Sequence, residues 1–283
     1  MKIPIYHLIL YIVEMRKYLL ILAMAFVTSA YSQILENKMS AKFNEAMAES
    51  HATNGSMAIM ETSTGKLLSS IGNIDEVRPT KILTPFVLLA CLESGRLKLT
   101  DEIDTGEGIY INGTDTIKDH NHRLGGYGVI SVLDGFTHCS DITTLKAIDK
   151  VFGHSEDYRK QLEAMDISSI DYLHCNASLL QILTLYNAIA NNNIKGKAEN
   201  VEAIKQALKS NMTDGLGRQF VSDKTEVAAY GRTTVLKNGT YKTNVCGYTP
   251  RYTIIVSMEQ AARPLPPNNC YRLFRDIVEL MAE

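Results

Sequence analysis

Residues 84–92 (TPFVLLACL) constrain the fold of this chain more than any other segment. Pro85 fits a helix only near its first turn, and Gly95 is placed to end one, so the segment is predicted to be a short helix. Its apolar side chains lie on every face of that helix, whereas a helix at a protein surface keeps one polar face. We therefore predict a helix at the centre of the protein, covered on all sides by the rest of the chain.

Strand patterns lie at both ends of the chain, and helical patterns lie mostly between them. The predicted strands are residues 56–61, 66–71, 226–235, 240–246 and 252–258. The predicted helices are residues 37–52, 84–92, 129–136, 178–190, 201–208 and a last segment around Leu273. The simplest packing of this order is an α+β fold (an α/β sandwich). It has an antiparallel sheet of about five strands built from both chain ends, flanked by helices, with an inserted all-helical subdomain at about residues 96–210.

The N-terminus has the layout of a secretory signal peptide. Basic residues follow Met15, residues 18–27 are apolar, and small residues suited to cleavage occupy positions 28–32. This apolar run is too short to span a bilayer, which needs about 20 residues. We predict that residues 1–32 are a signal peptide, with a possible start at Met15, and that residues 33–283 form a single domain exported to the periplasm or cell envelope. One long, charge-interrupted membrane anchor is the alternative.

Composition excludes several classes of function. The net formal charge is -2 and 21% of the residues are charged, so the basic excess typical of nucleic-acid binding is missing, and we expect no nucleic-acid partner. The five cysteines are odd in number and contain no C-x-x-C pair, which argues against zinc. Export would permit one disulfide. We expect neither a metal nor a cofactor.

Several stretches, in the right order, resemble the transpeptidase domain of penicillin-binding proteins, a branch of the serine DD-peptidase and β-lactamase-like superfamily. They are residues 55–61 with 64–68, 79–93, 117–121 with 127–128, 179–191 and 247–255. In that family a Ser-x-x-Lys supplies the nucleophile and its base. A Ser-x-Asn helps to move protons and holds the substrate amide, and a Lys-Thr-Gly on a strand binds the substrate carboxylate.

The positions equivalent to these motifs carry other residues in this chain. They are Lys81, Thr84, Cys139, Asp141, Arg232, Thr233 and Thr234, and only Thr233 is unchanged from the family pattern. A lysine at the nucleophile position cannot form a hydrolysable ester, and threonine is no base, so we assign no catalytic residue.

Two of the substitutions predict contacts. Asp141 can pair with Lys81, and we predict an ion pair between them that replaces the catalytic pair. Arg232 keeps the positive charge that suits a carboxylate, so we predict ligand binding by Arg232, Thr233 and Thr234. The branched side chain of Thr234 is expected to narrow the groove beside the strand.

Three other patterns could carry chemistry. Ser63 and Lys66 form a literal Ser-x-x-Lys, but they lie in a predicted turn, where residues i and i+3 do not stack. The thiol of Cys139 could act as a nucleophile if a cation lowered its pKa. His120 and His122 could suggest a metal, although the family pattern already accounts for the residues around Asn121.

The resemblance and the lost nucleophile together predict a pseudoenzyme. It is an exported, catalytically inactive, transpeptidase-like domain that binds a peptidoglycan peptide or a cell-envelope protein. One alternative is an active acyl-transfer enzyme of peptidoglycan with an atypical nucleophile such as Cys139. A second alternative is a structural scaffold whose groove is filled.

Overall fold

The computed structural model describes residues 15, 17–18, 33–153, 155–167, 176–264 and 268–283. Contacts divide the chain into two units, residues 1–44 and 45–283. In the first, residues 33–44 are helical. Most of the predicted signal peptide lies outside the described residues. Within the described part, no helix combines the length and the apolar character that crossing a membrane requires.

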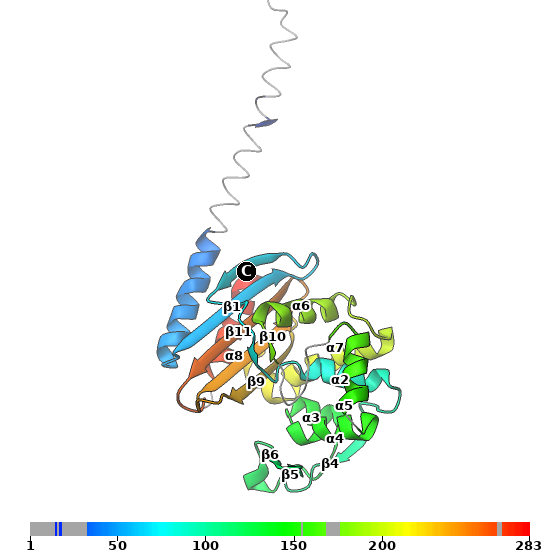
Figure 1. Cartoon of the computed structure of the whole chain (residues 1–283). Coiled ribbons are helices and arrows are strands. Elements are labelled where there is room, and N and C mark those ends of the chain that lie inside the picture. The colour runs from blue at the N-terminus through cyan, green and yellow to red at the C-terminus, as the bar shows by residue number, and fades with distance from the viewer. Residues whose placement is uncertain (1–14, 16, 19–32, 154, 168–175, 265–267) are drawn as a thin grey trace, which may run out of the picture. The chain divides into compact units, whose positions relative to one another are not determined.

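The second unit is built around a five-stranded antiparallel sheet with the order β2-β1-β11-β10-β9 (Figure 1). The strands are β1 (Asn54–Glu61), β2 (Leu67–Ile71), β9 (Ala228–Val235), β10 (Tyr241–Tyr248) and β11 (Tyr252–Gln260). Strand β1 pairs with β11, so that Met57 lies opposite Val256. The sheet is therefore assembled from both ends of the chain, and the predicted fold class is confirmed.

Helices α6 (Leu179–Ala190) and α8 (Asn269–Ala282) cover opposite faces of this sheet, and α7 (Ala198–Thr213) packs against β9 (Figure 1). Helix α6 begins with a capping box between Ser178 and Gln181. Its buried Asn187 side chain donates hydrogen bonds to the Thr62 carbonyl oxygen at 3.0 Å and to Thr253 Oγ1 at 3.1 Å, which ties the helix to the sheet. On the other face, helix α8 packs through an apolar stripe that includes residues 273, 274 and 277.

Helix α2 (Thr84–Glu93) is buried along almost its whole length, as its sequence predicted. It packs against α4, α5 and α7. Phe86 meets Tyr186 of α6 edge to face at 5.5 Å, and the Tyr186 hydroxyl donates to the Ile82 carbonyl oxygen at 2.8 Å. Gly95 follows the helix with a positive φ of 70°, a conformation that glycine adopts without strain.

The block inserted between β2 and β9 contains small sheets as well as helices. Its remaining helices are α3 (Val132–Thr137), α4 (Asp141–Phe152), α5 (Ser155–Ala164), α7 (Ala198–Thr213) and the 3-10 turns η1 (His122–Leu124) and η2 (Leu216–Phe220). The strands pair as β3 (Arg78–Pro79) with β8 (Asn176–Ala177), β4 (Glu102–Asp104) with β7 (Val129–Ser131), and β5 (Ile109–Asn112) with β6 (Asp115–Lys118).

This block corrects two details of the sequence prediction. The segment at 96–210 is not purely helical, and the helix predicted at 129–136 begins only at Val132. The first three of those residues pair as strand β7 with Glu102–Asp104 instead. Ser131 then accepts a hydrogen bond from the Asp134 amide at 3.0 Å and caps the helix, so the boundary is set by a capping residue inside the predicted helix.

The described cysteines are all free thiols. They are Cys91, Cys139, Cys246 and Cys270, and all four are buried. Burial raises the pKa of Cys91 to about 12, so this thiol behaves as a small apolar side chain. The fifth, Cys175, lies outside the described residues.

Leu89→Ala tests the central position of α2. Leu89 is fully buried, so the substitution leaves a cavity and is expected to lower the free energy of unfolding by about 2–5 kcal/mol. Equilibrium urea denaturation measures the change. The control is Leu124→Ala, at a side chain that is 89% exposed, with an expected change of about 0.5 kcal/mol or less. A loss below about 1 kcal/mol at Leu89 would contradict the packing.

Candidate functional site

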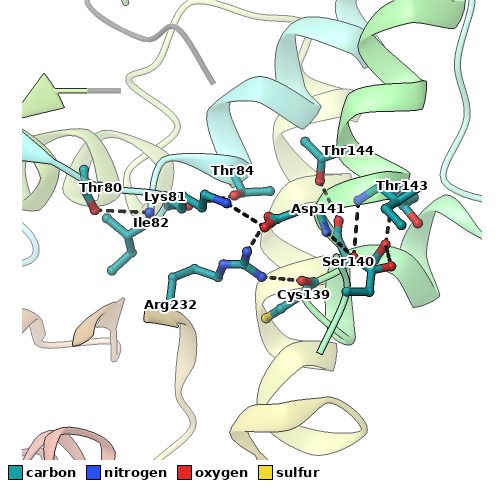
Figure 2. Close-up of polar contacts among 12 residues, drawn as sticks. Thr80, Lys81, Ile82, Thr84, Cys139, Ser140, Asp141, Thr143, Thr144 and Arg232 are labelled. Carbon is teal, nitrogen blue, oxygen red and sulfur yellow. Dashed lines mark hydrogen bonds and ion pairs between the residues drawn. The ribbon is translucent and has the colours of Figure 1, made fainter. Parts of the chain in front are cut away.

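Six of the seven predicted positions come from three separate parts of the chain and line one groove, whereas Thr84 does not line it. Figure 2 shows Lys81, Cys139, Asp141 and Arg232 of this group. Lys81 lies in the turn before α2, and Cys139 and Asp141 lie at the start of α4. Arg232 and the two threonines after it belong to β9. The sequence alignment that placed these residues together is therefore consistent with the structure.

Asp141 binds two cations at once, one through each carboxylate oxygen. Lys81 Nζ donates to Asp141 Oδ2 at 2.7 Å, and the Arg232 guanidinium pairs with Asp141 Oδ1. Arg232 also donates to the Cys139 carbonyl oxygen. The Asp141 and Arg232 side chains are only 12% and 10% exposed, and that of Lys81 is 33% exposed. The predicted ion pair between Lys81 and Asp141 is confirmed, and Arg232 joins it. We call these three residues the ion clasp.

The first turn of α4 fixes the position of Asp141. Ser140 Oγ caps the helix by accepting a hydrogen bond from the Thr143 amide at 3.0 Å. The buried Asp119 carboxylate accepts from the Asp141 and Ile142 amides at 2.9 Å and 3.3 Å and from Ser140 Oγ at 2.7 Å. Burial raises the pKa of Asp119, and these hydrogen bonds oppose that rise. The partial positive charge of the helix N-terminus favours both carboxylates.

Thr84 is at the position where the resemblance places the family's base. Its hydroxyl hydrogen-bonds within the turn that precedes α2. Thr84 Oγ1 donates to the Lys81 carbonyl oxygen at 2.7 Å, and the Thr84 amide makes a longer bond of 3.3 Å to the same oxygen. Residues 81–84 thus form a turn that leads into α2. It directs the Lys81 side chain towards Asp141 rather than towards Thr84 (Figure 2).

Cys139 occupies the turn between α3 and α4 and has a left-handed φ of 55°. Its side chain lines the groove but is only 8% exposed. The thiol lies 3.8 Å from the Gly231 carbonyl oxygen and 4.0 Å from the Asn211 side-chain nitrogen. Neither of these two groups is the base or cation that activates a thiol. The Arg232 guanidinium binds the Cys139 carbonyl oxygen and is paired with Asp141.

Strand β9 forms the edge of the sheet and one wall of the site. Its first half is buried, and from Arg232 onwards its side chains become partly or fully exposed. Thr233 Oγ1 hydrogen-bonds to Thr243 Oγ1 of β10 at 2.9 Å, directly across the strand pair. Thr234 lines the groove, and within the described part of the chain its buried Oγ1 has no hydrogen-bond partner.

A groove of about 720 Å³ runs beside β9 and includes the ion clasp. Its basic lining residues are Lys81, Lys118, Arg123, Arg232 and Arg263, and its acidic ones are Asp119 and Asp141. The clasp residues were predicted from the motifs. Lys118, Arg123 and Arg263 were not predicted as site residues, because none of them occupies one of the three motif positions. Lys118 ends β6, Arg123 lies in η1, and Arg263 follows β11.

The remaining sequence candidates do not form a site. Ser63 and Lys66 lie in the turn between β1 and β2, and neither lines the groove. His122 Nδ1 lies 2.8 Å from the Asp119 carbonyl oxygen, and His120 Nε2 lies 2.9 Å from the Tyr127 hydroxyl. No group of three or more His, Cys, Asp or Glu residues in the described ranges is arranged to hold a metal ion.

Asp141→Asn tests the ion clasp. The change leaves Lys81 and Arg232 side by side without their carboxylate, so the free energy of unfolding is expected to fall by about 2–4 kcal/mol. This loss is smaller than that for a fully buried ion pair, because Lys81 is partly exposed to water. Thermal and urea denaturation measure it. The matched control is Asp166→Asn, which removes an exposed partner of Lys195 and is expected to cost less than about 1 kcal/mol. Equal effects of the two changes would refute a structural role for the clasp.

No protein-family model and no curated protein matches the sequence. Solved structures do match the fold. The TP (transpeptidase) domain of Burkholderia pseudomallei penicillin-binding protein 3, in its apo form, has a TM-score of 0.74 and 16% identity, with 88% of this chain and 93% of that chain covered. A peptidoglycan glycosyltransferase from Burkholderia ambifaria has a TM-score of 0.70 and 17% identity, with 87% and 93% covered. The chain therefore has the fold of the penicillin-binding protein transpeptidase domain, as its sequence motifs predicted.

Proposed function

We propose that this chain is an exported protein of the transpeptidase fold that does not catalyse acyl transfer and instead binds a peptide in the groove beside β9. The peptide belongs to the cell wall or to a cell-envelope protein. The ion clasp is the observation that carries this proposal, because it occupies the positions of the family's nucleophile, amide-binding and carboxylate-binding residues. The signal-peptide pattern of residues 1–32 supports export.

The chemistry of the clasp argues against acyl transfer. A serine enzyme needs a hydroxyl with a base beside it. At the equivalent positions, Lys81 is an ammonium bound by a carboxylate, and the Thr84 hydroxyl is bonded to a main-chain carbonyl. An acylated lysine would be an amide, which is too stable to turn over. The clasp thus replaces a reactive pair by a structural one.

The groove itself supports binding. Its volume of about 720 Å³ lies within the usual range of ligand pockets, about 300–1,000 Å³, which disfavours the alternative of a filled scaffold. Because Arg232 is already bound by Asp141, a ligand carboxylate has to displace Asp141 or bind elsewhere in the groove. The ligand is therefore recognised in a different way from a transpeptidase substrate.

A fluorescent penicillin tests the absence of acyl transfer. The full chain, incubated with excess reagent, is expected to show no fluorescent band on a denaturing gel and no added mass by intact mass spectrometry. The transpeptidase domain of a penicillin-binding protein serves as the positive control. A covalent adduct on any residue of the groove would overturn the proposal.

An acyl-transfer enzyme that uses Cys139 is the second candidate, because this free thiol lines the groove. The limited exposure of the thiol and its amide and carbonyl neighbours predict slow reaction with iodoacetamide in the folded chain and fast reaction after denaturation. Peptide mass spectrometry locates the label, and Cys139→Ala is the control. Rapid labelling of Cys139 in the native protein, absent from the variant, would favour the enzyme.

A further inference from the structure

Three Asn–Gly pairs occur in the chain, at residues 54–55, 112–113 and 238–239. In such a pair the main-chain nitrogen of glycine can attack the side-chain amide of asparagine, because glycine has no side chain to obstruct the approach. We infer that Asn112 is a site of spontaneous deamidation, and that the fold protects the other two pairs. The inference goes beyond the proposed binding function and does not depend on it.

The reaction consumes one water molecule and releases one ammonia, so it needs no enzyme and no further reactant. The Gly113 main-chain nitrogen gives up its proton to the solvent and bonds to Asn112 Cγ, while the side-chain nitrogen takes up a proton and leaves as ammonia. The product is a five-membered succinimide ring, which water opens at either carbonyl carbon. One opening gives aspartate, and the other gives isoaspartate, in which the main chain continues through the former side-chain carbon.

The turn between β5 and β6 leaves both reacting groups available. Asn112 ends β5, and Gly113 begins the turn with a left-handed φ of 60°. Gly113 is exposed, and a Cβ atom added to it would meet no other atom within 4 Å. Among the described residues, neither the Gly113 amide nor the Asn112 side chain makes a hydrogen bond. Ring closure at this pair therefore breaks no hydrogen bond of either group.

The pair at 238–239 is a matched comparison, because both pairs continue as Asn-Gly-Thr and both glycines lie in exposed hairpin turns. Asn238 Oδ1 accepts hydrogen bonds from the Thr240 amide at 3.1 Å and from Thr240 Oγ1 at 2.7 Å. The Gly239 amide, which is the attacking group, donates to the Leu236 carbonyl oxygen at 2.9 Å. Ring closure here has to break these hydrogen bonds first, so we expect it to be at least about tenfold slower than at Asn112.

The pair at 54–55 is protected by the large sheet instead. Gly55 lies within β1, opposite Met258 of β11, and a Cβ atom on Gly72 would lie 2.4 Å from the Gly55 carbonyl oxygen. Ring closure turns the main chain of asparagine out of its extended conformation, and a closely packed strand of a five-stranded sheet resists this rotation. The β5–β6 hairpin has only two strands, an arrangement that is marginally stable by itself, so its turn opens more readily.

Deamidation at Asn112 is expected to loosen the hairpin. The register of the two strands places Asn112 directly opposite Asp115, so the new carboxylate faces an existing one. Like charges at opposite positions destabilise a strand pair. Isoaspartate also lengthens the main chain by one carbon and disturbs the register. The same hairpin carries Lys118, opposite Ile109, so the change affects a segment that contributes to the lining of the groove.

Peptide mass spectrometry tests the inference. The full chain is incubated in warm, mildly alkaline buffer, which favours the deprotonated amide, and digested at intervals. The peptide with Asn112 is expected to convert to aspartate and isoaspartate at least about tenfold faster than the peptides with Asn54 and Asn238. In urea-denatured chain the rates at 112 and 238 should become similar. Equal rates in the native chain, or the same tenfold difference after denaturation, would overturn the inference.

Thr240→Val tests the protection of Asn238. The substitution keeps the shape of the side chain but removes its hydrogen bond to Asn238, so deamidation at Asn238 is expected to accelerate roughly fivefold. The rate at Asn112 in the same digest is the internal control and should not change. An unchanged rate at Asn238 would refute the account of why this pair is slow.

Two substitutions at residue 112 test the effect on the hairpin. Asn112→Asp reproduces the aspartate product, and Asn112→Gln keeps a neutral amide and is the control. Amide hydrogen exchange within residues 115–118 is expected to be about two- to fivefold faster in the aspartate variant than in the glutamine variant, whereas residues 241–246 of β10 should not differ. Equal exchange at 115–118 in the two variants would refute the loosening. None of these results depends on penicillin labelling, so failure of the proposed function would be seen separately.

Discussion

The carboxylate of Asp141 joins the sheet to the helical block, and the site depends on this one interaction. Its oxygens bind Lys81, which precedes the central helix, and Arg232, which belongs to the edge strand. Because all three side chains are largely shielded from water, the opposite charges have to satisfy one another. The groove beside β9 keeps its shape at this end because the two walls are tied together.

The core explains why such a clasp can form. Helix α2 is packed on all sides, so the turn that carries Lys81 has a fixed position, and α4 is held at its start by Ser140 and Asp119. In a serine transpeptidase the family's motifs place reactive groups at these points. Here the same frame holds groups that neutralise one another. The fold is thus shared with these transpeptidase domains, while the residues at the motif positions differ.

The groove beside β9 has two kinds of cation in its lining. The cations of the clasp, Lys81 and Arg232, are paired with Asp141. Lys118, Arg123 and Arg263 are exposed and line the same groove. The lining carries five Lys and Arg residues against two Asp residues, so its unbalanced charge is positive.

The sequence by itself determined the buried helix, the strands at both chain ends and the motif positions, because hydrophobic periodicity and local spacing are properties of adjacent residues. It also predicted that Lys81 and Asp141 would pair. Only the tertiary structure showed that Arg232 also binds Asp141. It also showed that the helix capped by Ser131 begins later than the apolar pattern of residues 129–136 predicted. Lys118 and Arg123 are close in sequence, but Arg263 is far from them, and only folding brings all three into the lining of one groove.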